Sequence, residues 1–243
     1  MKLLDDIGDY WSKRSECFSE SINKSVDGES ADVWRAKVTK NFDISSPKRI
    51  LDIGTGPGFF PIILNGYGHD ITAIDYSEGM LEKARSNCEE RCCEAKFMQM
   101  DAHNLDFQNH SFDLILSRNL IWNLEKPKVA YREWMRVLRP GGTMMIFDGN
   151  HYLYLFDEEY ADSRHASEND NAVIGGVDVR IMRDIAKGLP LSKERRPQWD
   201  INVLMESGAT SIKVEFNKDD TICVDSPEGK VHLPDNFMIC VVK

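Results

Sequence analysis

The feature that most constrains this chain is a short apolar run that leads directly into three glycines at alternate positions, Leu51-Asp-Ile-Gly-Thr-Gly-Pro-Gly58. Glycine is used where the backbone takes a positive φ or where another group must approach closer than a Cβ permits. The dinucleotide fingerprint G-x-G-x-x-G would place its third glycine at position 59, which is Phe59, so a pyrophosphate site is disfavoured. The stretch predicts a strand that ends in a ligand-binding turn.

From residue 49 onward, β-rich runs alternate with helix-length amphipathic segments, which predicts parallel strands joined by crossover helices. Pro140-Gly-Gly142 is expected to end the third helix and turn into the next strand. No clear helix joins the last two strands, so we expect that pair to be antiparallel. The predicted strands are 49–53, 71–75, 95–101, 112–117, 143–148, 211–216 and 237–242, and the predicted helices are 59–66, 78–92, 128–138 and 199–207.

The alternation is absent at the start of the chain and for about fifty residues after Asp148. The first 48 residues are typical of helices with a polar break near Gly28. A chain of 243 residues suits one α/β core with an insertion. We therefore expect an N-terminal helical lid at 1–48 and a main domain at 49–243, whose insertion at about 149–195 caps the substrate.

Composition excludes several classes of function. The net charge of −10 disfavours a polyanionic partner such as nucleic acid, and no apolar run is long enough to cross a bilayer. The six cysteines have no repeating spacing and the first residues lack a secretory apolar core, which indicates the cytoplasm. Cys88, Cys92 and Cys93 have no further ligands nearby in the sequence, so no metal is expected.

Two carboxylates follow the glycine turn at the ends of the next predicted strands. Asp75 comes 21 residues after Gly54, and a carboxylate at that strand end can accept both hydroxyls of a ribose. Asp101 ends the third predicted strand, where it could accept the amino group of an adenine. Because carboxyl ends of parallel strands meet at one edge of a sheet, we expect both acids beside the glycine turn.

Taken together, these segments resemble the class I S-adenosylmethionine-dependent methyltransferases, most nearly the small-molecule branch that includes the quinone and sterol methyltransferases. The resemblance implies a Rossmann-like, seven-stranded, mostly parallel sheet with helices on both faces, in the order 3-2-1-4-5-7-6 with strand 7 antiparallel. The matching segments are 51–58, 75–81, 100–102, 111–115 and 137–142.

The resemblance also implies S-adenosylmethionine as cofactor, S-adenosylhomocysteine as product and a small-molecule acceptor. The glycines would line the methionyl part and the ribose, with Asp52 supporting the turn, while Arg14 would reach the cofactor carboxylate. Tyr76 and Met80 would flank the adenine. The residues expected at the cofactor are Tyr10, Arg14, Asp52, Gly54, Gly56, Gly58, Asp75, Tyr76, Met80, Asp101, Ala102 and Ser117.

Methyl transfer from a sulfonium is a direct displacement, so alignment and exclusion of water supply most of the catalysis. Trp11, Arg118, Asn119 and Trp122 are candidates for acceptor binding, and His151 or Tyr152 for a base, which only a proton-carrying acceptor requires. Two rival functions stay open. One is a protein that binds the cofactor without transferring methyl groups, and the other is a nucleic-acid methyltransferase, which the acidic balance disfavours. The sequence indicates no oligomeric state.

Overall fold

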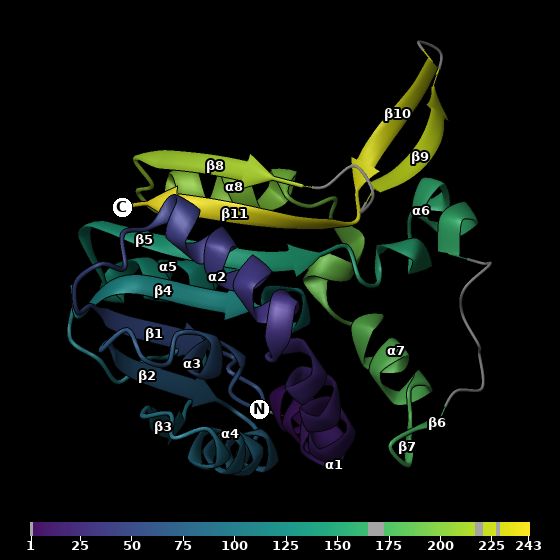
Figure 1. Cartoon of the computed structure of the whole chain (residues 1–243). Coiled ribbons are helices and arrows are strands. Elements are labelled where there is room, and N and C mark those ends of the chain that lie inside the picture. Colours follow the sequence, from purple (N-terminus) through teal and green to yellow (C-terminus); the bar gives the residue numbers. More distant parts are fainter. Residues whose placement is uncertain (1, 165–172, 217–220, 227–228) are drawn as a thin grey trace.

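The computed structural model describes residues 2–164, 173–216, 221–226 and 229–243. Its centre is a seven-stranded sheet in the order β3-β2-β1-β4-β5-β11-β8 (Figure 1). β11 runs antiparallel to β5 and to β8, and the other neighbouring strands are parallel, so the expected strand order is confirmed. The strands are β1 (Arg49–Ile53), β2 (Asp70–Asp75), β3 (Lys96–Gln99), β4 (Phe112–Arg118), β5 (Leu138–Gly149), β8 (Ser211–Glu215) and β11 (Asn236–Val242).

Helices cover both faces of the sheet (Figure 1). Successive residues of a strand point to opposite faces, and the core divides accordingly. Ile50 and Leu114 pack in one cluster with the helices from the first 90 residues, whereas Leu51 and Ile115 pack in the other with α5 and α8. The helices are α1 (Lys2–Ser25), α2 (Gly28–Asn41), α3 (Phe59–Ile63) and α4 (Glu78–Glu90) on the first face, and α5 (Pro127–Val137) and α8 (Gln198–Glu206) on the second.

Two boundaries differ by three or more residues from the sequence-based expectation. α3 ends at Ile63 instead of position 66, because the chain turns into Gly66, which has a φ of +88° that a helix does not contain. β5 already begins at Leu138, the last residue of the predicted third helix, and runs through Pro140-Gly-Gly142, which was expected to be a turn. The reason is a long-range contact, since Gly141 N donates to Lys243 O and Lys243 N donates to Gly142 O at the end of the chain.

The expected insertion folds into several short elements beside the carboxyl edge of the sheet (Figure 1). Residues 165–172, which belong to it, lie outside the described residues. α7 packs against α1, and η2 packs against η3. The elements are η2 (Leu153–Leu155), α6 (Glu158–Arg164), β6 (Val173–Ile174), β7 (Val177–Asp178), α7 (Arg180–Ala186) and η3 (Pro190–Lys193).

The connection between β8 and β11 contains two strands that the sequence did not predict. It forms an antiparallel hairpin of β9 (Thr221–Ser226) and β10 (Gly229–Pro234) that projects from the sheet (Figure 1). Residues 217–220 and 227–228, including Pro227, lie outside the described residues. Among the helices that the structure describes, none is both long enough and apolar enough to cross a membrane.

Candidate ligand-binding site

A cavity of about 360 Å³ opens at the carboxyl ends of β1, β2 and β4. Ligands of open α/β sheets bind at this edge, and cavities of about 300–1,000 Å³ hold small organic molecules. The strand ends and the loops that follow them form the floor. Residues of α1, α7 and η1 (Ile121–Asn123) complete the walls, so segments far apart in the sequence enclose one space.

The glycine turn lines this cavity with two of its three glycines. Gly54 and Gly56 have φ values of +71° and +54°, and both border the cavity. A Cβ on Gly54 would lie 2.7 Å from the Leu120 side chain, so a larger residue would displace that side chain. Gly58 does not line the cavity. It has a φ of +90°, and a Cβ there would lie 3.3 Å from the Ala84 backbone in α4, so Gly58 permits close helix packing instead.

Asp75, at the end of β2, borders the cavity and is held by the backbone on both sides. Its Oδ2 accepts a hydrogen bond from Gly56 N and its Oδ1 accepts one from Ser77 N, each at 2.9 Å. Burial raises the pKa of Asp75 to about 6, and the backbone hydrogen bonds oppose that shift. Ser77 also caps α4, because its hydroxyl accepts a hydrogen bond from Met80 N.

Asp52 lies behind the glycine turn and outside the main cavity. It is buried, and neither carboxylate oxygen has a hydrogen-bond partner among the described residues. Burial raises the pKa of Asp52 to about 7, chiefly because the charged form loses its water. Asp52 and Thr55 border a small adjacent cavity of about 20 Å³, which has room for one water molecule.

The loop after β3 brings Asp101 and Ala102 to the cavity. His103 Nε2 accepts a hydrogen bond from Lys126 N, so the proton of the neutral ring is on Nδ1, which donates to Asp101 Oδ1 at 2.6 Å. Trp134 Nε1 donates to Ala102 O and holds the loop in place. Two other expected cofactor residues, Tyr76 and Met80, also line the cavity.

One face of α1 closes the cavity from above the glycine turn. Tyr10, Trp11 and Arg14 line it as predicted, and Arg14 donates hydrogen bonds to Tyr10 Oη and Cys17 Sγ. The prediction missed Leu4, Ile7 and Phe18, which line the same space at helical spacing. Their positions at intervals of three to four residues from Trp11 could have indicated them, because such residues share a face of a helix.

The segment that follows β4 supplies another wall, with Arg118, Asn119 and Trp122 at the cavity. Asn119 has a φ of +53°, a conformation that asparagine tolerates better than most residues, and its carbonyl accepts a hydrogen bond from Trp122 Nε1. Ser117 was expected to lie at the cofactor, but it does not line the cavity. Its side chain is buried and donates a hydrogen bond to Ile53 O at 3.0 Å.

His151 and Tyr152 also reach the cavity and form an aromatic group with Trp122. The ring centroids of His151 and Tyr152 lie 5.3 and 5.2 Å from that of Trp122, and Trp11 of α1 approaches the same indole at 6.5 Å. Val179 and Met182, near and within α7, complete this part of the wall. The sequence could not predict the last two, because no local pattern assigns an insertion helix to a cavity.

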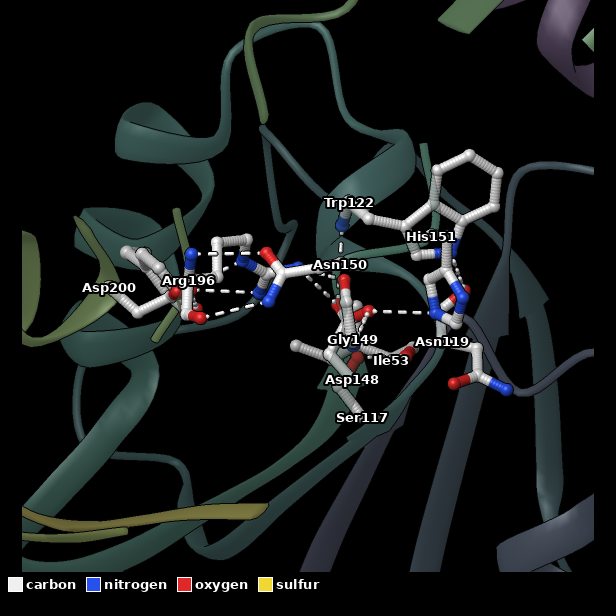
Figure 2. A network of polar contacts seen from close by, with 11 residues as sticks. Ile53, Ser117, Asn119, Trp122, Asp148, Gly149, Asn150, His151, Arg196 and Asp200 are labelled. Carbon is white, nitrogen blue, oxygen red and sulfur yellow. Dashed lines mark hydrogen bonds and ion pairs between the residues drawn. The ribbon is translucent and has the colours of Figure 1, made fainter. Parts of the chain in front are cut away.

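A buried polar network supports this wall from behind (Figure 2). Asp148, at the end of β5, accepts a hydrogen bond from Trp122 N at 3.2 Å and lies 3.4 Å from His151 Nε2. The Arg196 guanidinium approaches Asp148 to 3.2 Å and also pairs with Asp200 at 2.8 Å. The pKa of Asp148 is lowered although burial opposes this, because the charges of Arg196 and His151 favour the carboxylate.

The described residues contain no cluster of three or more His, Cys, Asp or Glu side chains that could hold a metal ion. The neighbouring cysteines are explained by packing, since Cys88 is buried and Cys93 Sγ contacts Pro61 O. The fold and the cavity thus define an α/β protein with a cavity of the size of a small organic ligand at the carboxyl edge of its sheet.

Comparisons with known proteins show which proteins this chain resembles. Residues 51–146 match a family described as a methyltransferase domain. Over 116 residues the chain is 34% identical to a demethylmenaquinone methyltransferase of Clavibacter sepedonicus, covering 47% of this chain and 46% of that protein. Over 148 residues it is 31% identical to the enzyme of the same name from Staphylococcus aureus, covering 58% and 60%. The chain thus matches about half of the length of these curated relatives.

Solved structures share the fold over a greater length. A proposed S-adenosyl-L-methionine-dependent methyltransferase from Methanococcus maripaludis has a TM-score of 0.61 at 22% identity, covering 96% of this chain and 93% of that one. A phosphoethanolamine N-methyltransferase from Haemonchus contortus in complex with S-adenosyl-L-methionine has a TM-score of 0.60 at 16% identity, covering 87% and 52%. The chain is therefore similar to a methyltransferase domain over residues 51–146 and shares its fold with S-adenosylmethionine-dependent methyltransferases.

Proposed function

We propose that this protein transfers a methyl group from S-adenosylmethionine to a small-molecule acceptor. The proposal rests on one observation. Asp75 and the glycine turn line one part of the same cavity that has an aromatic wall in another part. The match of residues 51–146 to a methyltransferase domain supports it. The two parts of the cavity have different roles in this proposal.

The cofactor fits the part of the cavity around β1 and β2. Each carboxylate oxygen of Asp75 already accepts one backbone hydrogen bond and keeps lone-pair capacity for a ribose hydroxyl. Tyr76, Met80, Asp101 and Ala102 line the cavity, which supports the proposal that the first two flank the adenine and the last two meet its polar edge. Gly54 and Gly56 border the part of the cavity that we assign to the methionyl part. When bound, the cofactor supplies an electrophilic methyl group on a sulfonium.

The acceptor is assigned to the wall formed by Trp11, Asn119, Trp122, His151 and Tyr152. Three aromatic rings around one space suit a planar or apolar molecule. The names of the curated relatives, demethylmenaquinone methyltransferases, are consistent with a quinone-like acceptor. The residues of this wall would hold the acceptor with an electron pair aligned to the methyl group that the cofactor would supply.

His151 is our first candidate for a base, and Tyr152 the second. Asp148 lies 3.4 Å from His151 Nε2, a position from which a carboxylate orients an imidazole and stabilises its protonated form. A proton-carrying acceptor would release its proton to this group, whereas a deprotonated acceptor would need none. In that case the protein accelerates the reaction by aligning the reactants and excluding water, and both α1 and the aromatic wall serve these purposes.

We also propose the division into a lid, residues 1–48, and an acceptor cap, residues 149–195. α1 supplies Tyr10 and Arg14 to the cavity, and the cap supplies His151 and Met182. We expect a cytoplasmic protein that does not act on nucleic acid. The six cysteines, none of which forms a disulfide, and the net charge of −10 support these two expectations.

Calorimetric titration with S-adenosylmethionine, S-adenosylhomocysteine and NAD tests the cofactor assignment. We expect binding of the first two in the micromolar range and none of NAD, and binding of NAD alone would contradict the proposal. Incubation with S-adenosylmethionine and a panel of quinols, phenols and amines then tests the transfer. Formation of S-adenosylhomocysteine together with a methylated acceptor supports an enzyme, whereas tight cofactor binding without turnover on the panel favours a binding protein.

A further inference from the structure

A second arginine of the cavity, Arg118, has an environment that the proposed function does not account for. Arg118 ends β4 and borders both the main cavity and the small cavity behind the glycine turn. Its guanidinium carbon lies 4.3 Å from the centroid of the Phe59 ring and 5.0 Å from that of Trp34. Contact with two aromatic rings restricts the side chain, so the direction of its planar donor fork is set before any ligand arrives.

Among the described residues, the Arg118 side chain donates no hydrogen bond and forms no ion pair. The other cavity arginine differs, since Arg14 donates to Tyr10 Oη and Cys17 Sγ. Loss of water lowers the pKa of Arg118 to about 10, which leaves it a cation near neutral pH. A partly buried cation with five unused N–H donors costs free energy that an anion at the same place would offset.

Asp52 does not fill this role, although it is the carboxylate whose charge acts on Arg118. The two side chains form no ion pair within 4.0 Å, and the small cavity of about 20 Å³ is lined by both. Burial raises the pKa of Asp52 to about 7, so near neutral pH this carboxyl is in part protonated. The positive charge of Arg118 is therefore incompletely balanced by the chain itself.

We propose that Arg118 binds the methionyl carboxylate of S-adenosylmethionine, an inference that rests on the proposed function. The cofactor carries one carboxylate, at the end of its amino-acid part. Asp75 marks the ribose position, and the glycine turn leads from Asp75 toward the start of α3, where Phe59 holds Arg118. A guanidinium fork and a carboxylate form two parallel hydrogen bonds, which fixes the end of the amino-acid part. This assignment takes the carboxylate away from Arg14, which already donates to Tyr10 Oη and Cys17 Sγ.

Calorimetry with a matched pair of ligands tests the assignment without a need for the acceptor. S-adenosylmethionine and its decarboxylated form differ by the carboxylate alone. For Arg118→Gln we expect a loss of about 10- to 100-fold in affinity for S-adenosylmethionine, the range for a charge-assisted hydrogen bond to a charged group. The affinity for the decarboxylated form should change little. Arg14→Gln is the matched control and should leave the difference between the two ligands as in the wild type.

Arg118→Lys separates charge from geometry, because lysine keeps the cation and loses the fork. We expect an intermediate affinity for S-adenosylmethionine, and this variant keeps the test available if Arg118→Gln does not fold by circular dichroism. Equal loss for both ligands, or no loss for either, would overturn the assignment, as would an Arg14→Gln variant that alone abolishes the difference. If the wild type binds neither ligand, the proposed function itself fails, which is a separate result.

Discussion

Arg196 and Asp148 form an ion pair of 3.2 Å in which both side chains are fully buried, and it joins the segment before α8 to the end of β5. Asp200 takes the other side of the same guanidinium, and Tyr131 donates its hydroxyl hydrogen to Asp200 (Figure 2 shows the acidic residues around Arg196). Through Asp148 the network holds Trp122 and His151 at the cavity wall. One cation therefore balances two buried carboxylates that support the site.

Replacement of Arg196 should destabilise the fold strongly. Arg196→Met would leave Asp148 and Asp200 buried without a counter-charge, and we expect a loss of about 3–5 kcal/mol in the free energy of unfolding, measured by urea denaturation. Arg195→Met is a matched control in the next residue, because Arg195 pairs with Asp157 and Glu159 at the surface and should cost less than about 1 kcal/mol. Equal losses in the two variants would disprove this account.

The contrast between Arg195 and Arg196 also shows where sequence reasoning ends. Strand positions and the strand order were predictable, because apolar runs and glycine turns are local signals and β1 matches its predicted range of 49–53. Nothing local distinguishes two adjacent arginines, one exposed and one buried against a carboxylate 48 positions earlier in the chain. The β9–β10 hairpin was also missed, although Ile222 and Val224 in one strand and Val231 and Leu233 in the other stand at alternate positions.

Some residues of the candidate site could likewise be predicted from the sequence, and others could not. The glycine turn, Asp75 and Asp101 could be predicted because each stands at the end of a predicted strand, and the structure brings them to one cavity. Gly58 and Ser117 do not line this cavity, because Gly58 packs against α4 and the Ser117 hydroxyl donates to Ile53 O, contacts that the motif does not indicate. Phe18 and Met182 belong to the walls through tertiary packing alone.

Asp75→Ala should weaken cofactor binding. If the carboxylate accepts the ribose hydroxyls, its loss should reduce the binding free energy of S-adenosylmethionine by about 1.5–3 kcal/mol, measured by calorimetry. Asp70→Ala, at the opposite end of the same strand, removes an exposed carboxylate that pairs with Lys96 and should leave affinity unchanged. Wild-type affinity in a folded Asp75→Ala protein would refute the ribose assignment.

Substitutions at Gly58 and Gly66 can separate the cost of backbone strain from the cost of lost close packing. Both have a φ near +90°, so alanine at either position should cost about 1 kcal/mol from the backbone alone. Around Gly66 a Cβ meets nothing within 4 Å, whereas at Gly58 it lies 3.3 Å from the Ala84 backbone of α4. We therefore expect Gly58→Ala to lower the free energy of unfolding by at least about 1 kcal/mol more than Gly66→Ala, measured by urea denaturation. Similar values for the two variants would show that α4 shifts freely.

Asp52 should make stability depend on pH. Its pKa is 3.8 when unperturbed and about 7 in the fold, so between these values the folded state retains a proton that the unfolded state has released. The free energy of unfolding should therefore fall as pH rises from about 4 to about 7, by about 1.4 kcal/mol for each unit of pKa difference, and change little through this group above that range. Asp52→Asn cannot ionise and should lose less stability over this interval, measured by urea denaturation at several pH values. Asp70→Asn, at an exposed site, is the control and should retain the wild-type dependence, and the same dependence in Asp52→Asn would contradict the prediction.

The lid assignment predicts that ligand binding protects α1 from hydrogen exchange. Trp11, Arg14 and Phe18 line the cavity from α1, so a ligand that contacts them should oppose local opening of this helix. With saturating S-adenosylhomocysteine we expect slower exchange of the amides at 10–18, followed by mass spectrometry. The amides of α8 lie on the opposite face of the sheet and serve as the internal control, since their exchange should change only as much as global stability does. Protection confined to the glycine turn, with α1 unchanged, would mean that α1 is a fixed part of the fold and that the ligand enters by another route.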